Sequence, residues 1–378
     1  MTAREIPWLR GGQPVLGHAN EMRRGPQAFL TRVRDELGDM ARFRVLNRRM
    51  ILASNPAVIE RVLVDNPRSY SKRTAAYDIV RLTVGNGLAT SSGDFWLRQR
   101  RLAQPAFHRE KIAGFAELIK RAVDDAIARM RNNEPFDFAA HMTRLTSRII
   151  GEALFSRDVS DDSDRAGAAI AELARQGVQR TYGIYDPPLW LPTARNQRFR
   201  HARAVLDEIV FGVIKARRAG EHKNDLLSML LDSVDAETGE RMDDAQLRDE
   251  VVTMFIAGHE TTSVLLSWCM HALLDRPELV ERCRSDAKFL DATLQETLRL
   301  YPPAWQIGRR IEVDDEADGW HLPAGHVVLL CQWTTHRNPR LWHNPEHFDP
   351  ERFLVEDAAR PKLAFFPFIA GPRKCIGD

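Results

Sequence analysis

A cysteine near the end of the chain lies in a setting that suits a thiolate held against a large, flat ligand. Two glycines flank the sulfur and allow a tight backbone turn, while two cations precede it and favour the thiolate. An aromatic residue seven positions upstream can anchor the loop. The alternative is a small buried hydrophobe without chemistry. These residues are Phe368, Gly371, Arg373, Lys374, Cys375 and Gly377.

A second candidate interrupts the middle of the longest helical pattern, 243–274, at Ala257, Gly258, Glu260 and Thr261. A carboxylate and an alcohol in the centre of an apolar helix cost free energy unless they are satisfied. The Thr261 hydroxyl can donate to an earlier carbonyl, and Gly258 can let the helix widen to admit a ligand. The alternative is a polar kink without chemistry.

Two further pairs have helical spacing. Glu296 and Arg299 stand at i and i+3, and Trp96 and Arg100 at i and i+4, so each pair shares one face of a helix. An acid–base pair of this kind is usually an exposed ion pair that contributes roughly a few tenths of a kcal/mol to stability. Spacing alone is therefore a weak signal.

Two strings suggest other chemistry that their context disfavours. Residues 343–347 match the inverted zinc-protease pattern H-x-x-E-H, which needs both histidines on one helical turn. Pro345 lacks a backbone donor and disfavours that helix, so we do not expect zinc. Gly85-Asn86-Gly87 lacks the strand–turn–helix context of a dinucleotide site.

The elements that must position these residues are mainly helical. The helical period dominates 95–274, and further helices are expected at 27–37, 56–64 and 277–300. Of two adjacent arginines on the strand that follows, alternation favours Arg309 over Arg310 for the inward position. One mainly α domain with a small β portion, spanning 1–378, is the simplest account. Short strands are expected at 41–45, 50–53, 309–313, 319–322 and 326–330.

Composition excludes several classes of protein. The net charge of +2 shows no excess of cations, which argues against nucleic-acid binding. Four cysteines without a C-x-x-C pair fit a reducing compartment, and no apolar run has membrane length. We therefore expect a cytoplasmic protein without a membrane anchor.

Five elements together resemble the cytochrome P450 family and occur in its order: W-x-x-x-R, A-G-x-E-T-T, E-x-x-R, P-E-R-F and the cysteine loop. The resemblance implies a long central helix over haem b. Cys375 would ligate the iron, Thr261 would hydrogen-bond bound dioxygen, and Glu260 would help relay protons. Other residues implied to contact or adjoin the haem are Trp96, Arg100, Ala257, Gly258, Arg309, Phe368 and Arg373. Residues implied to form a supporting charge network are Glu296, Arg299 and Arg352.

The resemblance further implies a haem-thiolate monooxygenase that inserts one oxygen atom from O2 into an apolar small molecule, by hydroxylation or epoxidation. Electrons would come from a separate ferredoxin-type or flavodoxin-type donor with its reductase, docking on a basic face near Arg373 and Lys374. Trp305 and Ile307 suggest an apolar ligand such as a terpenoid, steroid or fatty acid, although both can equally be core. An alternative is isomerisation or dehydration on the same scaffold without oxygen activation.

Relatives in this family continue past the cysteine with a helix and a terminal β region, which this sequence does not contain. A following helix would point free N–H groups at the thiolate, so we expect the 378-residue chain to bind haem poorly compared with an extended version. An inactive, truncated haem-protein fragment is therefore a further alternative. The short stretch 277–296 also leaves little room for the additional helix that many relatives carry there.

Overall fold

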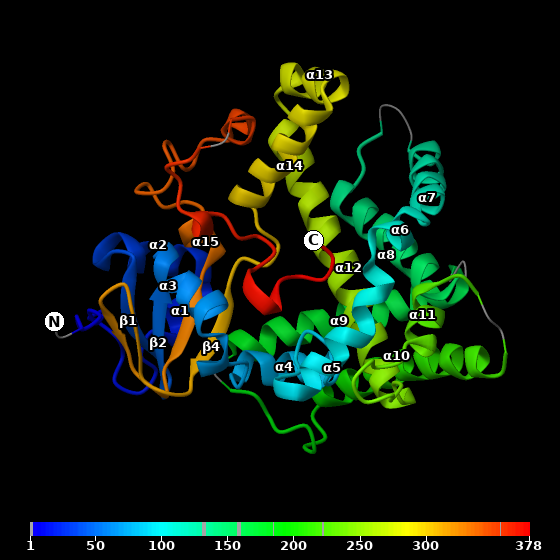
Figure 1. Ribbon diagram of the computed structural model, residues 1–378, viewed down its shortest axis with the longest axis horizontal. Helices are drawn as coiled ribbons and strands as arrows, with labels where there is room; N and C mark the ends of the chain where they lie inside the picture. The colour runs from blue at the N-terminus through cyan, green and yellow to red at the C-terminus, as the bar shows by residue number, and fades with distance from the viewer. Residues whose placement is uncertain (1–2, 131–133, 157–159, 184, 221–222, 356) are drawn as a thin grey trace.

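The longest helix, α12 (Asp244–Leu273), runs through the middle of the molecule (Figure 1). It begins after Asp243, whose side chain accepts the Gln246 N–H at 2.8 Å, while the Gln246 side chain accepts the Asp243 N–H. This capping box satisfies free amides at the helix N-terminus. The helix expected at 243–274 is confirmed.

Helices make up most of the chain, and the expected mainly α class with a small β portion is confirmed. The computed structural model describes residues 3–130, 134–156, 160–183, 185–220, 223–355 and 357–378. The other helices are α1 (Ala19–Arg24), α2 (Pro26–Leu37), α3 (Pro56–Glu60), α4 (Ala75–Val84), α5 (Gly93–Ala103), α6 (Arg109–Ala113), α7 (Ala116–Ala128), α8 (Phe138–Phe155), α9 (Ser160–Tyr182), α10 (Ala194–Arg218), α11 (Leu226–Asp232), α13 (Pro277–Ser285), α14 (Ala287–Leu300) and α15 (Gln332–Thr335).

The described strands form a five-stranded sheet in the order β1-β2-β7-β4-β3 and a separate hairpin, β5-β6. Figure 1 shows the larger sheet beside α1, α2 and α3, with the longer helices on the opposite side of the molecule. Sequence periodicity missed β3 and β5, because two or three residues are too few to show alternation. The strands are β1 (Met40–Val45), β2 (Arg48–Ala53), β3 (Tyr70–Ser71), β4 (Ile307–Ile311), β5 (Asp315–Ala317), β6 (Trp320–Leu322) and β7 (Val327–Leu330).

The register of β4 separates the two adjacent arginines. Arg309 lies opposite Val328 of β7 and is 3% exposed, whereas Arg310 is exposed. The expected inward position of Arg309 is confirmed. The strand itself lies two residues earlier than the expected range 309–313.

The prediction of a single helix over 277–300 is wrong, because the chain forms two helices there, α13 and α14. Asp286 separates them in an extended conformation, and its side chain accepts the N–H groups of Lys288 and Phe289 at 2.9 and 3.2 Å. Asp at this position therefore caps a new helix rather than continuing the old one. The single residue between them leaves no room for a further helix in this stretch.

The middle of α12 is buried on one side only. Val251 and Val252 are buried in a core cluster that includes residues of α8, α10 and α11. Ala257, Glu260 and Thr261 are exposed instead. The helix therefore has one packed face and one open face, and Glu260 and Thr261 lie on the open one.

The C-terminal segment runs back from the sheet side towards α12 (Figure 1). It contains short 3₁₀ turns at Pro350–Phe353, Lys362–Ala364 and Gly371–Arg373 rather than long elements. This course brings the cysteine loop to the region between the sheet and the central helix.

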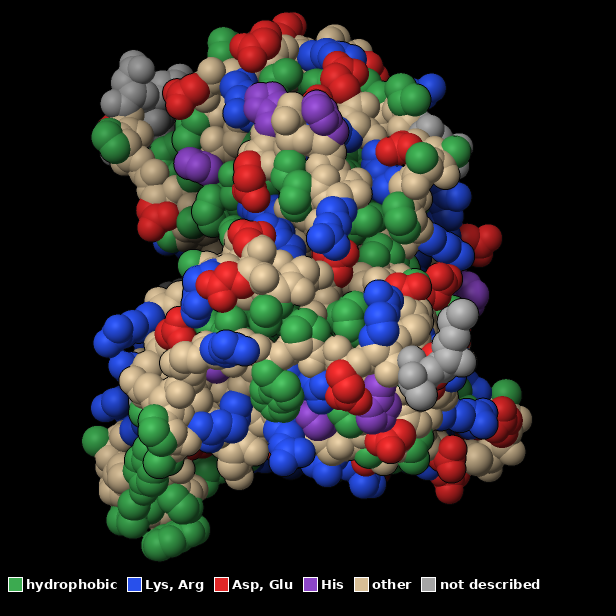
Figure 2. All heavy atoms as spheres, turned by 90° about the vertical axis from the view of Figure 1, so that its left-hand side faces the viewer, with side chains coloured by type: hydrophobic (Ala, Val, Ile, Leu, Met, Phe, Trp, Pro, Cys, Tyr) green, Lys and Arg blue, Asp and Glu red, His purple; other side chains and the backbone are tan. Residues whose placement is uncertain are grey.

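Figure 2 shows the face at the sheet side, where basic and acidic side chains are interspersed. This agrees with the nearly balanced charge of the chain. Among the described helices, none combines the length and the apolar run that crossing a bilayer requires.

Candidate active site

Backbone contacts shape the cysteine loop. The Cys375 N–H donates to the Phe368 carbonyl at 2.9 Å, and the Lys374 N–H donates to the Gly371 carbonyl at 3.0 Å. Gly371 has φ of +68°, and a Cβ there would lie 2.0 Å from the Leu63 carbonyl oxygen. Only glycine allows this approach. The loop leaves the Cys375 side chain exposed, so the sulfur is available to a ligand.

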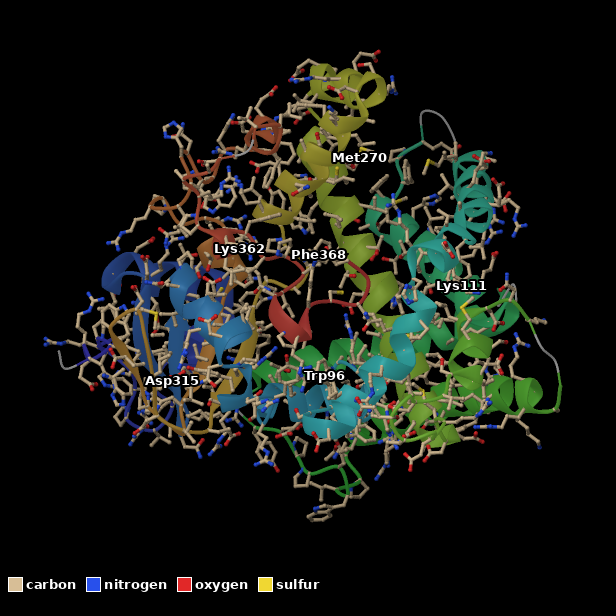
Figure 3. The ribbon with its side chains drawn as sticks, in the orientation of Figure 1. Trp96, Lys111, Met270, Asp315, Lys362 and Phe368 are labelled. Carbon is tan, nitrogen blue, oxygen red and sulfur yellow. The ribbon has the colours of Figure 1, made fainter. Side chains whose placement is uncertain are left out.

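Trp96 and Arg373 stack on each other, although they come from α5 and from the cysteine loop. The Arg373 guanidinium lies 3.6 Å from the Trp96 ring centroid, and its Nη1 donates to the Ser91 carbonyl at 3.0 Å. Burial, together with the charge of Arg309, lowers the pKa of Arg373 to about 10. Figure 3 labels Trp96 and Phe368 near the region between the sheet and α12.

Arg100 reaches the cysteine loop from the same face of α5. Its Nη1 donates to the Lys374 carbonyl at 3.1 Å. Burial lowers the pKa of Arg100, and the nearby charge of Cys375 opposes that effect. The spacing of Trp96 and Arg100 therefore brings both side chains to one loop.

Three cations gather near this loop, and we call them the cation cluster: Lys72, Arg309 and Arg373. Arg309 Nη1 donates to the Tyr77 hydroxyl at 2.9 Å, whereas its buried Nη2 has no partner among the described residues. Lys72 Nζ donates to the Ala89 carbonyl at 2.7 Å. Within the described part of the chain, no carboxylate lies within 4.0 Å of the cationic groups of the cluster.

The electrostatics of Lys72 show how unbalanced the cation cluster is. Burial, followed by the charges of Arg309, Arg373 and Arg81, holds the pKa of Lys72 well below its usual 10.5. Buried charges of one sign are costly unless a counter-charge compensates them. The cluster therefore fits a ligand that brings carboxylates, such as the two propionates of haem.

Sequence reasoning missed Lys72 and Tyr77. Lys72 stands between Ser71 and Arg73 in a short polar run that reads as solvent-exposed. Its burial comes from the folded chain around it, and single-sequence patterns carry no such signal. The adjacent loop supplies the carbonyl that holds it.

The open face of α12 presents Ala257, Glu260 and Thr261 of the A-G-x-E-T-T element. The Thr261 hydroxyl donates to the Ala257 carbonyl at 2.7 Å, as expected for a threonine that bonds back along its helix. Both residues and Glu260 are exposed on this face. A hydroxyl and a carboxyl on an accessible surface can hold and exchange protons.

Gly258 points away from that face, towards α8. A Cβ at Gly258 would lie 3.1 Å from Ile150 Cδ1, so the glycine permits close packing of the two helices. The helix is α-helical throughout Asp244–Leu273. The expected local widening at Gly258 is therefore wrong, and helix packing explains the missing side chain.

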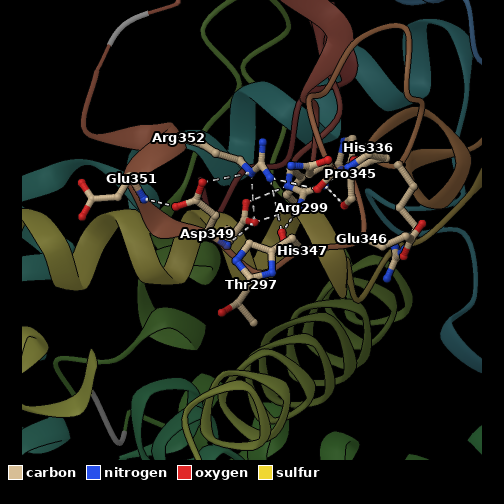
Figure 4. A network of polar contacts seen from close by, with 12 residues as sticks. Thr297, Arg299, His336, Pro345, Glu346, His347, Asp349, Glu351 and Arg352 are labelled. Carbon is tan, nitrogen blue, oxygen red and sulfur yellow. Dashed lines mark hydrogen bonds and ion pairs between the residues drawn. The ribbon is translucent and has the colours of Figure 1, made fainter. Parts of the chain in front are cut away.

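The Glu296–Arg299 pair is fully buried and forms the centre of a network (Figure 4). Arg299 donates through Nε and Nη2 to the two Glu296 oxygens at 2.7 Å each. Arg352 Nε lies 3.4 Å from Glu296 Oε1, which also accepts the Asp349 N–H at 2.8 Å. The structure thus brings all three expected network residues together.

His336 links this network to the C-terminal segment. Its Nε2 accepts the Phe366 N–H at 3.1 Å, and its carbonyl accepts from Arg299 Nη1 at 2.8 Å. Burial and the Arg299 charge lower the pKa of His336 to about 3. His336 therefore stays neutral and acts as an acceptor.

The zinc-like string forms turns, and Asn344 within it has φ of +42°. The carbonyls of His343 and Asn344 accept from Arg352 instead. Among the described residues, no group of three or more His, Cys, Asp or Glu side chains could hold a metal ion.

The structure also bears on the predicted ligand contacts of Trp305 and Ile307 and on the predicted basic docking face. Trp305 and Ile307 pack against hydrophobic core clusters, so their core interpretation is the better supported. Arg373 stacks on Trp96, and Lys374 pairs with Asp378, so neither is a free cation on a basic docking face.

Comparison with known proteins identifies the family. The cytochrome P450 family model matches residues 7–378. Cyclooctat-9-en-7-ol 5-monooxygenase of Streptomyces melanosporofaciens is 33% identical, covering 99% of this chain and 86% of the relative. Cyclooctatin synthase of the same organism is 34% identical (97% and 84% covered), and pentalenene oxygenase of Streptomyces avermitilis is 30% identical (97% and 86%). The chain belongs to the cytochrome P450 family, of the bacterial type, and is a cytochrome P450 monooxygenase.

Proposed function

We propose that this monooxygenase binds haem b between the cysteine loop and the open face of α12, with Cys375 as the iron ligand. The cation cluster carries this proposal, because three cations without described acidic partners fit the haem carboxylates. Arg100 and Trp96 complete that side of the site through their contacts with the loop. When bound, a thiolate-ligated haem supplies reduction and cleavage of O2.

The residues of α12 supply the protons. Glu260 is exposed and can exchange a proton with solvent, while the Thr261 hydroxyl, held by the Ala257 carbonyl, can pass one on. Such positioned proton transfer contributes roughly 10²–10⁴-fold to a rate. Ala257 leaves the face beside Thr261 free of a large side chain.

The substrate we propose is an apolar, terpenoid-type small molecule, hydroxylated or epoxidised by one oxygen atom. Two relatives carry cyclooctat-9-en-7-ol and pentalenene in their names, which supports this class. A ferredoxin-type or flavodoxin-type protein with its reductase would deliver the electrons. Reduction rates measured with each purified donor decide between the two types. The cytoplasmic location stays a prediction.

Thr261→Ala tests the reaction class. We expect the yield of oxygenated product per O2 consumed to fall roughly tenfold or more, because the hydroxyl that delivers the proton is lost while electron uptake continues. Thr261→Ser should retain most of the yield, and Thr262→Ala, next on the same helix, serves as the control. Turnover of the substrate without O2, unaffected by Thr261→Ala, would support the isomerisation alternative instead.

Lys72→Met tests the cation cluster. We expect haem release to an acceptor protein to accelerate about tenfold, because a charge-assisted contact to the haem carboxylates is lost. In the haem-free chain, the lowered pKa of Lys72 means that the unfolded state binds more protons, so stability should rise as the pH approaches 10.5. Lys72→Met should remove this rise. The exposed Lys111→Met is the control, and unchanged haem release would contradict the assignment.

A further inference from the structure

The two glycines that suggested a nucleotide motif instead allow the 85–91 loop to lie against α12. A Cβ on Gly85 would lie 1.9 Å from Asp249 Oδ1, and one on Gly87 would lie 2.5 Å from Thr253 Oγ1. Gly85 also has φ of +74°, which other residues rarely adopt. Glycine at both positions thus permits a close contact between loop and helix.

Two successive carboxylates of α12 bind this loop through its backbone. Asp249 Oδ2 accepts the Asn86 N–H at 2.7 Å, and Glu250 Oε2 accepts the Leu88 N–H at 3.0 Å. Arg248 holds Asp249 in place with a contact of 2.9 Å. Glu250 is 1% exposed, and its Oε1 has no partner among the described residues. The Leu88 N–H is the one hydrogen-bond partner of the buried Glu250 carboxyl among the described residues, so the loop and this carboxyl hold each other in position.

The next three carbonyls of the same loop accept hydrogen bonds from cations. Two of these cations belong to the cation cluster, and the third, Arg81, adds to its positive charge. Lys72 Nζ donates to the Ala89 carbonyl at 2.7 Å, Arg81 Nη2 to the Thr90 carbonyl at 2.9 Å, and Arg373 Nη1 to the Ser91 carbonyl at 3.0 Å.

We propose that Asp249 and Glu250 are positioning residues, which hold Lys72 and Arg373 of the cation cluster in place through the 85–91 loop. This rests on the proposed function, in which the cluster binds the haem carboxylates. The loop is closed on itself, since the Thr90 hydroxyl donates to the Gly85 carbonyl at 2.7 Å. Fixing its amides on α12 therefore fixes its carbonyls, which hold mutually repelling cations together. The helix that carries Thr261 thus also positions Lys72 and Arg373 of the cation cluster.

Paired substitutions in the haem-bound protein test this proposal. Glu250→Ala removes the acceptor of the Leu88 N–H, whereas Glu250→Gln keeps an acceptor oxygen. We expect Glu250→Ala to accelerate haem transfer to an acceptor protein about tenfold, as loss of one buried hydrogen bond implies. Glu250→Gln should stay within about twofold of the wild type. Asp249→Ala and Asp249→Asn should show the same contrast.

Amide hydrogen exchange in the haem-free chain supplies a second readout. Exchange at Leu88 should accelerate in Glu250→Ala and not in Glu250→Gln. Leu230→Ala, in the buried core of α11, controls for general destabilisation. Equal haem release from Glu250→Gln and Glu250→Ala would overturn the proposal. So would haem release from Leu230→Ala as fast as that from Glu250→Ala. Unchanged Leu88 exchange in Glu250→Ala would also overturn it. If the wild type takes up no haem, the proposed function fails, and Leu88 exchange still decides whether the carboxylates hold the loop.

Discussion

Cys375→Ala is expected to abolish monooxygenation, together with the ferrous–CO absorption band typical of thiolate ligation. Alanine cannot ligate iron, and without the thiolate the haem loses the electron donation that favours O–O cleavage. The backbone bond from the Cys375 N–H to the Phe368 carbonyl does not involve the sulfur, so the loop should keep its shape. The absorption spectrum of the reduced, CO-treated protein measures the ligand directly.

The other cysteines provide matched controls. Burial raises the pKa of Cys269 and of Cys331, so both thiols stay protonated and poor ligands. Cys283 is half-buried and lies 3.4 Å from the Thr293 hydroxyl. Cys283→Ala should therefore leave the band and the activity unchanged. A retained thiolate band in Cys375→Ala would assign the ligand elsewhere.

Several elements could be predicted because their signals are local. The capping residue Asp243 marks the start of α12, and alternation along a strand places Arg309 inward. The tight turn of the cysteine loop could also be predicted from its glycines, because Gly371 has a conformation and a close contact that only glycine tolerates. The helix cap and the strand alternation are local signals, whereas the close contact of Gly371 is with Leu63, which is distant in the sequence.

Other features depended on packing that a sequence does not display. Lys72 looks like an ordinary exposed lysine, and its burial is a consequence of the surrounding fold. Gly258 read as a helix irregularity, yet the decisive neighbour is Ile150 on another helix. Asp286 could have been recognised as a helix cap, but the continuous helical period around it concealed the break.

The E-x-x-R spacing shows the same limit most directly, because among the described residues it occurs in three ion pairs of very different burial. Two of them lie largely at the surface, and only one is completely buried. Spacing therefore cannot identify the network, and burial does. The pairs are Glu172–Arg175, Glu281–Arg284 and Glu296–Arg299.

Arg299→Met is expected to lower the free energy of unfolding by about 3–5 kcal/mol, because it leaves the Glu296 carboxylate buried with its main partner gone. Arg299 is fully buried, and besides Glu296 it donates to the carbonyls of His336, Pro345 and His347. Methionine fills similar space but donates nothing. Chemical denaturation monitored by circular dichroism measures the loss.

The Glu172–Arg175 pair has the same spacing and offers a control. Arg175→Met should cost at most about 1 kcal/mol, because Arg175 is exposed and Glu172 keeps its contacts with Gln176 and Arg198. Combining Arg299→Met with Glu296→Gln should cost less than the sum of the two single changes, since each alone strands the other group. A strictly additive double variant, or equal losses for Arg299→Met and Arg175→Met, would show that the buried pair does not act as a unit. The coupling then distinguishes a network that supports the cysteine-loop side of the site from two independent hydrogen-bonding residues.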